Sequence, residues 1–185
     1  MIITMTGRPC SGKSVIIEYL VANHGFKRFS AGEIYRRVAQ ERGIDVLDLN
    51  RLHDYSVDKL VDSEIIKYAK QHFEEDIIFD SRIAWHFVPE SFKVYVDVDD
   101  DEQVRRFLNV HRDTEITNVS PEEAKKRLDE RWKLENDRYM DMYGFNNLDK
   151  SQYDLVINNT TSTVEESAEK IYNGYLQYVK SRENN

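Results

Sequence analysis

The first fourteen residues, MIITMTGRPCSGKS (1–14), decide the fold of this chain. A short apolar run leads into the spacing Gly-x-x-x-x-Gly-Lys-Ser, and an apolar segment with helical spacing follows. Glycine at both positions lets the backbone wrap with its N–H groups turned inward. These groups, together with the positive end of the next helix, hold phosphate oxygens. A strand, this loop and a helix in that order predict a nucleoside triphosphate site. The residues expected to bind the triphosphate are Gly7, Arg8, Pro9, Cys10, Ser11, Gly12, Lys13 and Ser14.

Three side chains in or near this loop have distinct expected roles. Lys13 places a positive charge on the β and γ phosphates, and the Ser14 hydroxyl is available to Mg²⁺. Asp80 ends a buried apolar strand at the edge where ligands gather, so its carboxylate is a second candidate for orienting Mg²⁺, directly or through water. An N-cap or an ion pair to Arg82 is an equally good interpretation of Asp80.

The composition limits the kind of protein this is. A length of 185 residues suits one domain, 1–185, and a net charge of −8 argues against nucleic acid as a main partner, since such binding depends on basic side chains. The single cysteine, Cys10, excludes an internal disulfide. No apolar run approaches the roughly 18 residues of a membrane span, and the N-terminus lacks the basic start of a signal peptide. We expect a cytoplasmic protein with no membrane contact and no obligate protein partner.

Short apolar runs alternate with segments of helical spacing along the whole chain. The runs predict strands at 2–5, 27–29, 77–79, 94–98 and 155–157. The helical patterns cover 13–23, 31–42, 56–73, 101–111, 121–142 and 164–180. This alternation predicts a three-layer α/β/α fold of the P-loop nucleoside triphosphatase type, with a parallel five-stranded sheet and ligands at the carboxyl ends of its strands.

Two segments depart from the simple alternation. Residues 31–73 are entirely helical and long enough to form a small insertion between strands. Residues 112–140 are polar and rich in arginine, which suits a mobile lid. Both segments are candidates for closing over a second substrate.

Five arginines are candidates for contact with a moving phosphoryl group, because such transfer depends mainly on positioning and positive charge. They are Arg36, Arg82, Arg112, Arg131 and Arg138. Arg131, Glu135 and Arg138 are spaced to share one face of a helix. Taken alone, that face also fits exposed ion pairs of little energetic value.

The order and spacing of several motifs resemble the cytidylate kinase family, in its compact form, over nearly the whole chain. The motifs are the loop 7–14, Ser30-Ala31-Gly32-Glu33-Ile34-Tyr35-Arg36, Asp80-Ser81-Arg82 near Trp85, His111-Arg112-Asp113, Glu130-Arg131 with Glu135 and Arg138-Tyr139, Tyr143-Gly144, and Tyr153-Asp154-Leu155-Val156-Ile157-Asn158.

The resemblance implies transfer of the γ-phosphoryl group of ATP to CMP or dCMP, with Mg²⁺ as cofactor. It implies that segment 31–73 binds the monophosphate and that 112–140 is the lid. It assigns Lys13, Arg112 and Arg131 to catalysis, and Asn159 to the adenine end of the ATP site. It assigns acceptor binding to Arg36, Arg82, Glu135 and Arg138, with Glu135 on the cytosine side.

Two alternatives stay open from the sequence. A kinase for another nucleotide or small phosphorylated acceptor would keep the loop and the arginines. A non-catalytic nucleotide sensor would bind ATP without transfer, although it has little need for acceptor arginines. For Cys10, one hypothesis is a thiol activated by the helix N-terminus and Lys13; the other is a small, inert residue whose sulfur faces the sheet.

Overall fold

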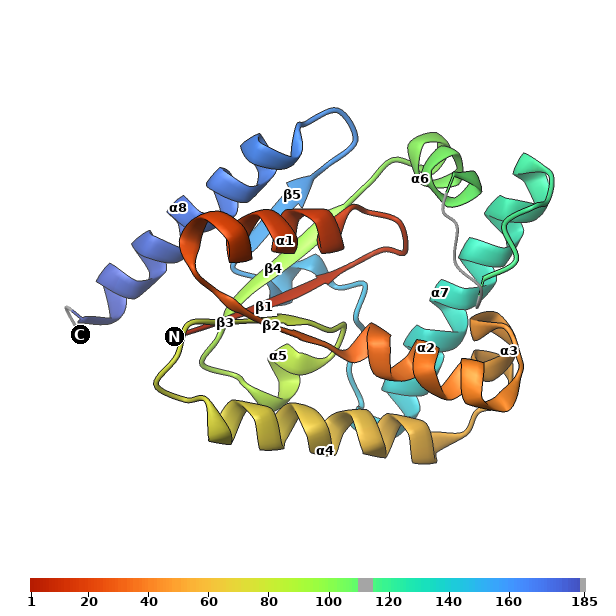
Figure 1. The fold of residues 1–185 in the computed structure, drawn as a ribbon, viewed down its shortest axis with the longest axis horizontal. Helices are drawn as coiled ribbons and strands as arrows, with labels where there is room; N and C mark the ends of the chain where they lie inside the picture. Colours follow the sequence, from red (N-terminus) through yellow and green to blue (C-terminus); the bar gives the residue numbers. More distant parts are fainter. Residues whose placement is uncertain (110–114, 184–185) are drawn as a thin grey trace.

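The computed structural model describes residues 1–109 and 115–183. Five strands form one parallel sheet in the order β2-β3-β1-β4-β5 (Figure 1). Their bounds are Ile2–Gly7 for β1, Lys27–Ser30 for β2, Ile77–Asp80 for β3, Phe92–Asp97 for β4 and Leu155–Asn158 for β5. The five parallel strands predicted from the sequence are confirmed, each within two residues at either end.

The helices lie between and after these strands. Their bounds are Lys13–His24 for α1, Ala31–Arg42 for α2, Val46–Arg51 for α3, Tyr55–Gln71 for α4, Ala84–Phe87 for α5, Asp100–Leu108 for α6, Pro121–Tyr143 for α7 and Val164–Glu183 for α8, with a 3₁₀ turn at Lys150–Gln152. Every predicted helix is present, with the end of 101–111 beyond the described residues. The sequence patterns missed α3 and α5, because four to six residues are too few to show a helical period.

Side-chain caps explain several of the helix boundaries. Ser120 accepts a hydrogen bond from the Glu123 backbone N–H and Pro121 occupies the first turn of α7. Gly43, at φ +66°, ends α2, and Asp45 begins α3 by accepting from the Leu47 N–H. The helical segment 31–73 is therefore broken into three helices by local turn chemistry.

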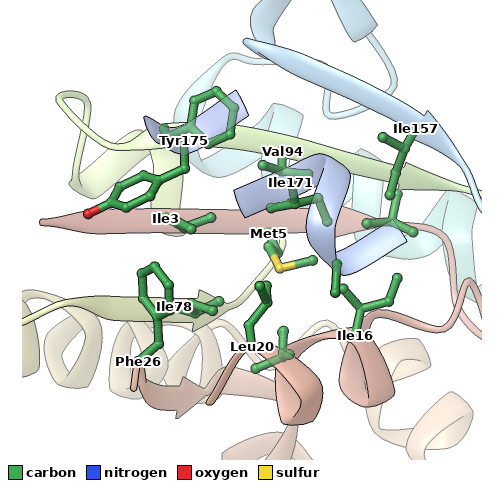
Figure 2. Packing of buried hydrophobic residues seen from close by; sticks show 14 residues of the cluster. Ile3, Met5, Ile16, Leu20, Phe26, Ile78, Val94, Ile157, Ile171 and Tyr175 are labelled. Carbon is green, nitrogen blue, oxygen red and sulfur yellow. The ribbon is translucent and has the colours of Figure 1, made fainter. Parts of the chain in front are cut away.

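One face of the sheet is covered by α1 and α8, which pack against each other and against the central strands (Figures 1 and 2). Ile3 and Met5 of β1 point to this face and meet Ile16 of α1 and Ile171 of α8. These side chains are fully buried, so each contributes about 1.5–3 kcal/mol through removal of apolar surface from water.

The opposite face is covered by α4, α5 and the end of α7. Ile77 and Phe79 of β3 alternate with Ile78 and point away from the first core into a second one. Ile65 of α4 and Tyr139 of α7 pack there. Helices on both faces make the three-layer α/β/α arrangement that the alternating pattern predicted.

Two smaller apolar clusters lie outside the sheet. Val38 and Val46 belong to one that joins α2, α3 and the start of α4. Phe107 and Leu128 belong to another between α6 and α7. Within 1–109 and 115–183, no helix is both long and apolar enough to cross a lipid bilayer.

All five strands run in the same direction, so their carboxyl ends meet at one edge of the sheet. The residues that end the strands there are Gly7, Ser30, Asp80, Asp97 and Asn158. The loop before α1, the start of α2 and the segment after β3 all leave from this edge, which is where a ligand is expected in an open parallel sheet.

Candidate active site

The loop between β1 and α1 depends on its two glycines. A Cβ on Gly7 would lie 2.2 Å from the Val96 carbonyl oxygen, so no larger residue fits where β1 passes β4. Gly12 has φ +91°, and a Cβ there would lie 2.5 Å from Nδ2 of Asn159. That same amide donates to the Ser11 carbonyl oxygen at 2.8 Å. The glycines therefore bring the loop close enough for neighbouring segments to fix it.

A cavity of about 540 Å³ opens at the carboxyl edge of the sheet, between this loop, α2, α4, α6 and α7. Thirteen of the residues singled out from the sequence line it: Pro9, Cys10, Ser11, Gly12, Lys13, Ser14, Arg36, Asp80, Arg82, Arg131, Glu135, Arg138 and Asn159. Gly7 and Arg8 are outside its lining, and Arg112 falls beyond the residues that the structure describes.

Arg8 belongs to the loop, but its guanidinium is directed toward α6. It donates to the Val98 carbonyl oxygen at 3.0 Å, to Asp100 at 2.7 Å and to Gln103 at 2.7 Å. Gln103 in turn donates to the Pro9 carbonyl oxygen at 2.8 Å. These contacts fasten the loop to α6 and leave the Arg8 side chain away from the phosphate position expected from the sequence.

Lys13 and Asp80 face each other at the base of the cavity, with Nζ and Oδ1 3.6 Å apart. Arg28 donates to the other Asp80 oxygen at 3.0 Å, so the ion pair to Arg82 considered from the sequence is not the one formed. Burial would raise the pKa of the Asp80 carboxyl, but Lys13 and Arg28 outweigh it and hold that pKa below its usual value. Burial lowers the pKa of Lys13, and Asp80 partly offsets this.

The donor set near Lys13 fits Mg²⁺. Ser14 and the ionised carboxylate of Asp80 both line the cavity beside the loop, and both offer the hard oxygens that Mg²⁺ prefers. Among the described residues, no cluster of three acidic, histidine or cysteine side chains stands ready for a metal. An ion here would complete its shell with phosphate oxygens and water, as Mg²⁺ does beside nucleotides.

Glu135 is the centre of a buried cluster of arginines. Its Oε1 accepts from Arg131 Nε at 3.0 Å, and its Oε2 lies 2.9 Å from Arg82 Nε. Arg131 also lies 3.5 Å from Glu115, and the Arg82 guanidinium lies over the Trp132 ring, 5.3 Å from its centroid. Burial would raise the pKa of the Glu135 carboxyl, yet the surrounding arginines lower it, so the group is ionised. The interpretation of this helix face as exposed ion pairs is wrong, since Glu135 is only 3% exposed.

Arg138 links α7 to the helical segment that precedes β3. Only 1% of it is exposed, and its Nε lies 2.8 Å from Oδ2 of Asp58 on α4. It donates to Asn50 of α3 at 3.0 Å, and its guanidinium lies over the rings of Tyr35 and Tyr139. The sequence predicted the position of Arg138 but none of these partners.

Arg36 reaches the cavity from α2. A Cβ on Gly32 would lie 3.1 Å from its Nη1, so the glycine leaves room for the guanidinium one turn away. Gly32 lies in the first turn of α2, and its missing side chain makes space for a charged group.

Several cavity residues were missed by sequence reasoning. Arg106 donates to the Ser11 carbonyl oxygen at 3.1 Å and to the Asn159 carbonyl oxygen at 2.7 Å, tying the loop to the segment after β5. Arg106 belongs to none of the motifs that the sequence shows. Asp58 and Tyr35 were also missed, because a carboxylate or a phenol within a helical pattern gives no signal by itself.

Cys10 lines the cavity and packs against the cluster of Phe107, Ala124 and Leu128 between α6 and α7. The expectation that an inert Cys10 would turn its sulfur toward the sheet is wrong. Its backbone has φ 58°, in the left-handed region that is uncommon for residues other than glycine.

Asn159 is 4% exposed and its side chain is held on both sides. Its Nδ2 donates to Ser11 and its Oδ1 accepts from the Ser167 hydroxyl at 2.8 Å. Its amide therefore fixes the loop, and Asn159 is part of the cavity lining. Taken together, the site offers a phosphate-binding loop at one end and a group of buried guanidiniums facing it.

Comparison with known proteins agrees with this arrangement. A sequence profile of the cytidylate kinase-like family matches residues 2–161. The cytidylate kinase of Sulfurisphaera tokodaii is 30% identical over 184 residues, covering 98% of each chain, and that of Sulfolobus acidocaldarius is 33% identical over 175 residues, covering 92% of each. The shikimate kinase of Acinetobacter baumannii has a TM-score of 0.58 at 14% identity, covering 98% of this chain and 93% of that one. This structural likeness shows the fold alone, and the predicted P-loop fold is confirmed.

Proposed function

This chain belongs to the cytidylate kinase-like family, and we propose that it is a phosphotransferase acting on nucleoside monophosphates. It transfers the γ-phosphoryl group of ATP to CMP or dCMP and releases ADP with CDP or dCDP. The observation that carries this proposal is the single cavity in which Lys13 of the loop faces the arginine cluster around Glu135. Both substrates carry negative phosphates, and each side of the cavity offers positive charge to one of them. Lys13 serves the donor triphosphate, and the arginines serve the acceptor phosphate.

ATP binds through the loop in this proposal. The backbone N–H groups of residues 7–14 and the start of α1 hold its phosphates, and Lys13 contacts the β and γ groups. Asn159 borders the adenine end while holding the loop at Ser11. Ser14 and Asp80 would hold Mg²⁺, and the ion would neutralise part of the phosphate charge.

The acceptor phosphate binds opposite the loop in this proposal, and four arginines of the described residues take part. Arg36, Arg82 and Arg138 hold it, and Arg131 stabilises the transferring group, with Arg112 in the same role. Glu135 belongs to the acceptor site and keeps Arg82 and Arg131 aligned at 2.9 Å and 3.0 Å. Prearranged charges of this kind need no reorganisation when the phosphoryl group moves.

Two segments close over the substrates in this proposal. Residues 31–73, which contain α2, α3 and α4, bind the acceptor, and 112–140 acts as the lid. Arg138 supports such coupling, because its contacts with Asp58 and Asn50 join α7 to α4 and α3. Closure excludes water, which otherwise competes as acceptor.

We also propose a cytoplasmic protein whose partners are ATP and a nucleoside monophosphate. Neither nucleic acid, a membrane nor an obligate protein partner is part of this proposal. The net charge of −8 supports leaving nucleic acid out.

A coupled assay of ADP release tests the proposed reaction. ATP is supplied with CMP, dCMP, UMP, AMP or no acceptor, and CMP or dCMP is expected to give the highest kcat/KM. Preference for another acceptor would favour a different small-molecule kinase, and ATP binding without ADP release would favour a sensor.

A matched pair of lysine variants ties that activity to this cavity. Lys13→Met is expected to lower kcat at least about 100-fold, because a group aimed at transition-state charge is lost. Lys133→Met on the exposed side of α7 removes the same charge outside the cavity and is expected to keep parental activity. Equal activity of the two variants would contradict the site.

A further inference from the structure

The guanidinium of Arg82 has few aligned contacts of its own. Arg82 lies two residues after β3 and lines the cavity, with Nε 2.9 Å from Oε2 of Glu135 and the guanidinium over the Trp132 ring. Within 1–109 and 115–183, its Nε has no aligned hydrogen bond. An ion pair and a ring restrict the direction of a guanidinium less than aligned hydrogen bonds do. The place of this group therefore depends on where the Arg82 backbone is fixed.

The Arg82 carbonyl oxygen accepts a hydrogen bond from Trp85 of α5. The indole Nε1 donates to it at 3.0 Å. The hydroxyl of Thr6 on β1 also reaches this oxygen, at the longer distance of 3.3 Å. Trp85 is the closer of the two donors, so the position of its indole decides how well the Arg82 backbone is held.

Asn147 orients that indole from the other side. It is 1% exposed and lies after the end of α7. Its Oδ1 lies 3.2 Å from Trp85 Nε1 and accepts from the Tyr153 hydroxyl at 2.9 Å. An indole N–H only donates, so the amide must present its oxygen to Trp85. The Asn147 backbone N–H donates at 2.9 Å to Oδ1 of Asn136, which ties this group to α7.

Two neighbouring residues of α7 thus reach opposite ends of Arg82. Glu135 contacts the guanidinium. Asn136 reaches the carbonyl oxygen indirectly, through Asn147 and Trp85. Consecutive residues of a helix project about 100° apart, so one can face the cavity while the next faces the segment after the helix. The position of Arg82 is in this way set relative to the helix that carries the other arginines.

We infer that Trp85 is a positioning residue for the acceptor phosphate: its indole N–H, oriented by Asn147, fixes Arg82 where the guanidinium meets that phosphate. The inference rests on the proposed function, in which Arg82 holds the acceptor, and adds the residues that set its position. Neither Trp85 nor Asn147 lines the cavity, so their effect on the acceptor passes through Arg82. Small displacements matter, since an error of about 1 Å in placement can cost about 100-fold in rate.

The test is Trp85→Phe, which keeps an aromatic ring beside Phe145 and removes the indole N–H. KM for CMP is expected to rise about 3- to 10-fold, as for the loss of one hydrogen bond, while KM for ATP stays within about twofold of the parent. Binding without ATP gives a second readout. The parent is expected to bind CMP more tightly than cytidine, and the variant to lose roughly 3- to 10-fold of that difference, because only CMP carries the phosphate.

Tyr178→Phe is the matched control. The Tyr178 hydroxyl donates to the Glu90 carbonyl oxygen at 2.8 Å, so this variant also removes an aromatic donor from a backbone carbonyl. Tyr178 belongs to α8 and does not line the cavity, and both KM values are expected to stay parental.

Arg82→Ala gives a second control. In that background, Trp85→Phe is expected to change KM for CMP by less than about twofold, since no guanidinium remains to be positioned. An undiminished effect would mean that Trp85 acts by another route and would overturn the inference.

Thermal unfolding of every variant is measured alongside. If Trp85→Phe does not fold, Asn147→Leu removes the oxygen that orients the indole, and the same rise in KM for CMP is expected. Parental kinetics in the folded variant, or equal changes in KM for CMP and ATP, would overturn the inference. If the parent prefers another monophosphate, the proposed choice of CMP fails, and the same series with that acceptor and its nucleoside still tests Trp85. A parent that transfers to no acceptor overturns both.

Discussion

Replacing Glu135 by glutamine tests whether one buried carboxylate holds the arginine cluster together. The side chain keeps its size and one acceptor oxygen but loses its charge. Arg82 and Arg131 would then be two largely buried guanidiniums, 17% and 15% exposed, without a common counter-ion.

The expected loss follows from this geometry. Removing one partner of a buried ion pair costs about 3–5 kcal/mol, because the remaining charge stays desolvated. Because the glutamine oxygen can still accept a hydrogen bond from Arg131, we expect a loss at the lower end of this range, about 3 kcal/mol. For a domain of this size, each kcal/mol lowers Tm by about 2–4 °C, so a fall of about 6–12 °C is expected.

The assay is thermal and urea unfolding of the parent and Glu135→Gln at pH 7, without nucleotide. Glu130→Gln is the control, since Glu130 lies on the same helix and pairs with Arg51 at the surface. Those side chains are 33% and 47% exposed, and an exposed pair contributes at most about 1 kcal/mol. The Glu130 variant should therefore unfold close to the parent.

The dependence on pH gives an independent check. The folded-state pKa of Glu135 is lowered from 4.5, so its contribution to stability is present above the unfolded-state value. That contribution is lost as the pH falls through the folded-state pKa, and the difference between parent and Glu135→Gln should shrink in acid. Equal stability of the two proteins at pH 7, or a difference that grows in acid, would refute the reasoning.

Three further predictions concern the loop and the segments around the cavity. Gly7→Ala should lower the free energy of unfolding, measured in urea, by at least about 1–3 kcal/mol, because the added Cβ would meet the Val96 carbonyl oxygen at 2.2 Å. Parental stability of this variant would contradict that contact. If the Cys10 thiol is reactive, iodoacetamide should inactivate the parent, ATP with Mg²⁺ should protect it, and Cys10→Ala should stay active and resistant; equal rates of inactivation would show that Cys10 is inert. Amide exchange in 31–73 and 115–140 should slow more with ATP plus CMP than with ATP alone; unchanged exchange in 31–73 on adding CMP would count against acceptor binding there.

Much of the fold could be predicted because its signals are local. Ile2–Gly7 and Ile77–Asp80 are strands whose apolar runs are visible in the sequence, and each is followed by a polar or glycine residue at the carboxyl edge. The end of α2 at Arg42 was predicted, but α3 was missed, although Asp45 carries the chemistry of a helix start. Helix α3, Val46–Arg51, is too short to show a helical period.

The candidate site was predicted unevenly. The phosphate loop could be predicted because its function depends on consecutive residues, from Gly7 to Ser14. The partners of Arg138 could not, since Asp58 is 80 positions away along the chain and belongs to a different helix. Arg106 belongs to none of the motifs found in the sequence, and only the packing of α6 beside the loop brings it to Ser11.

The sequence by itself determined the parallel sheet, the phosphate loop and the set of arginines, because each depends on residue type and near-neighbour spacing. Only the tertiary structure decided how those charges are arranged. It set Glu135 between Arg82 and Arg131, turned Arg8 away from the cavity, and paired Asp58 of α4 with Arg138 of α7. The reason is physical: a buried charge is stable only beside its counter-ion, and that neighbour comes from whichever helix the packing of the cores brings alongside.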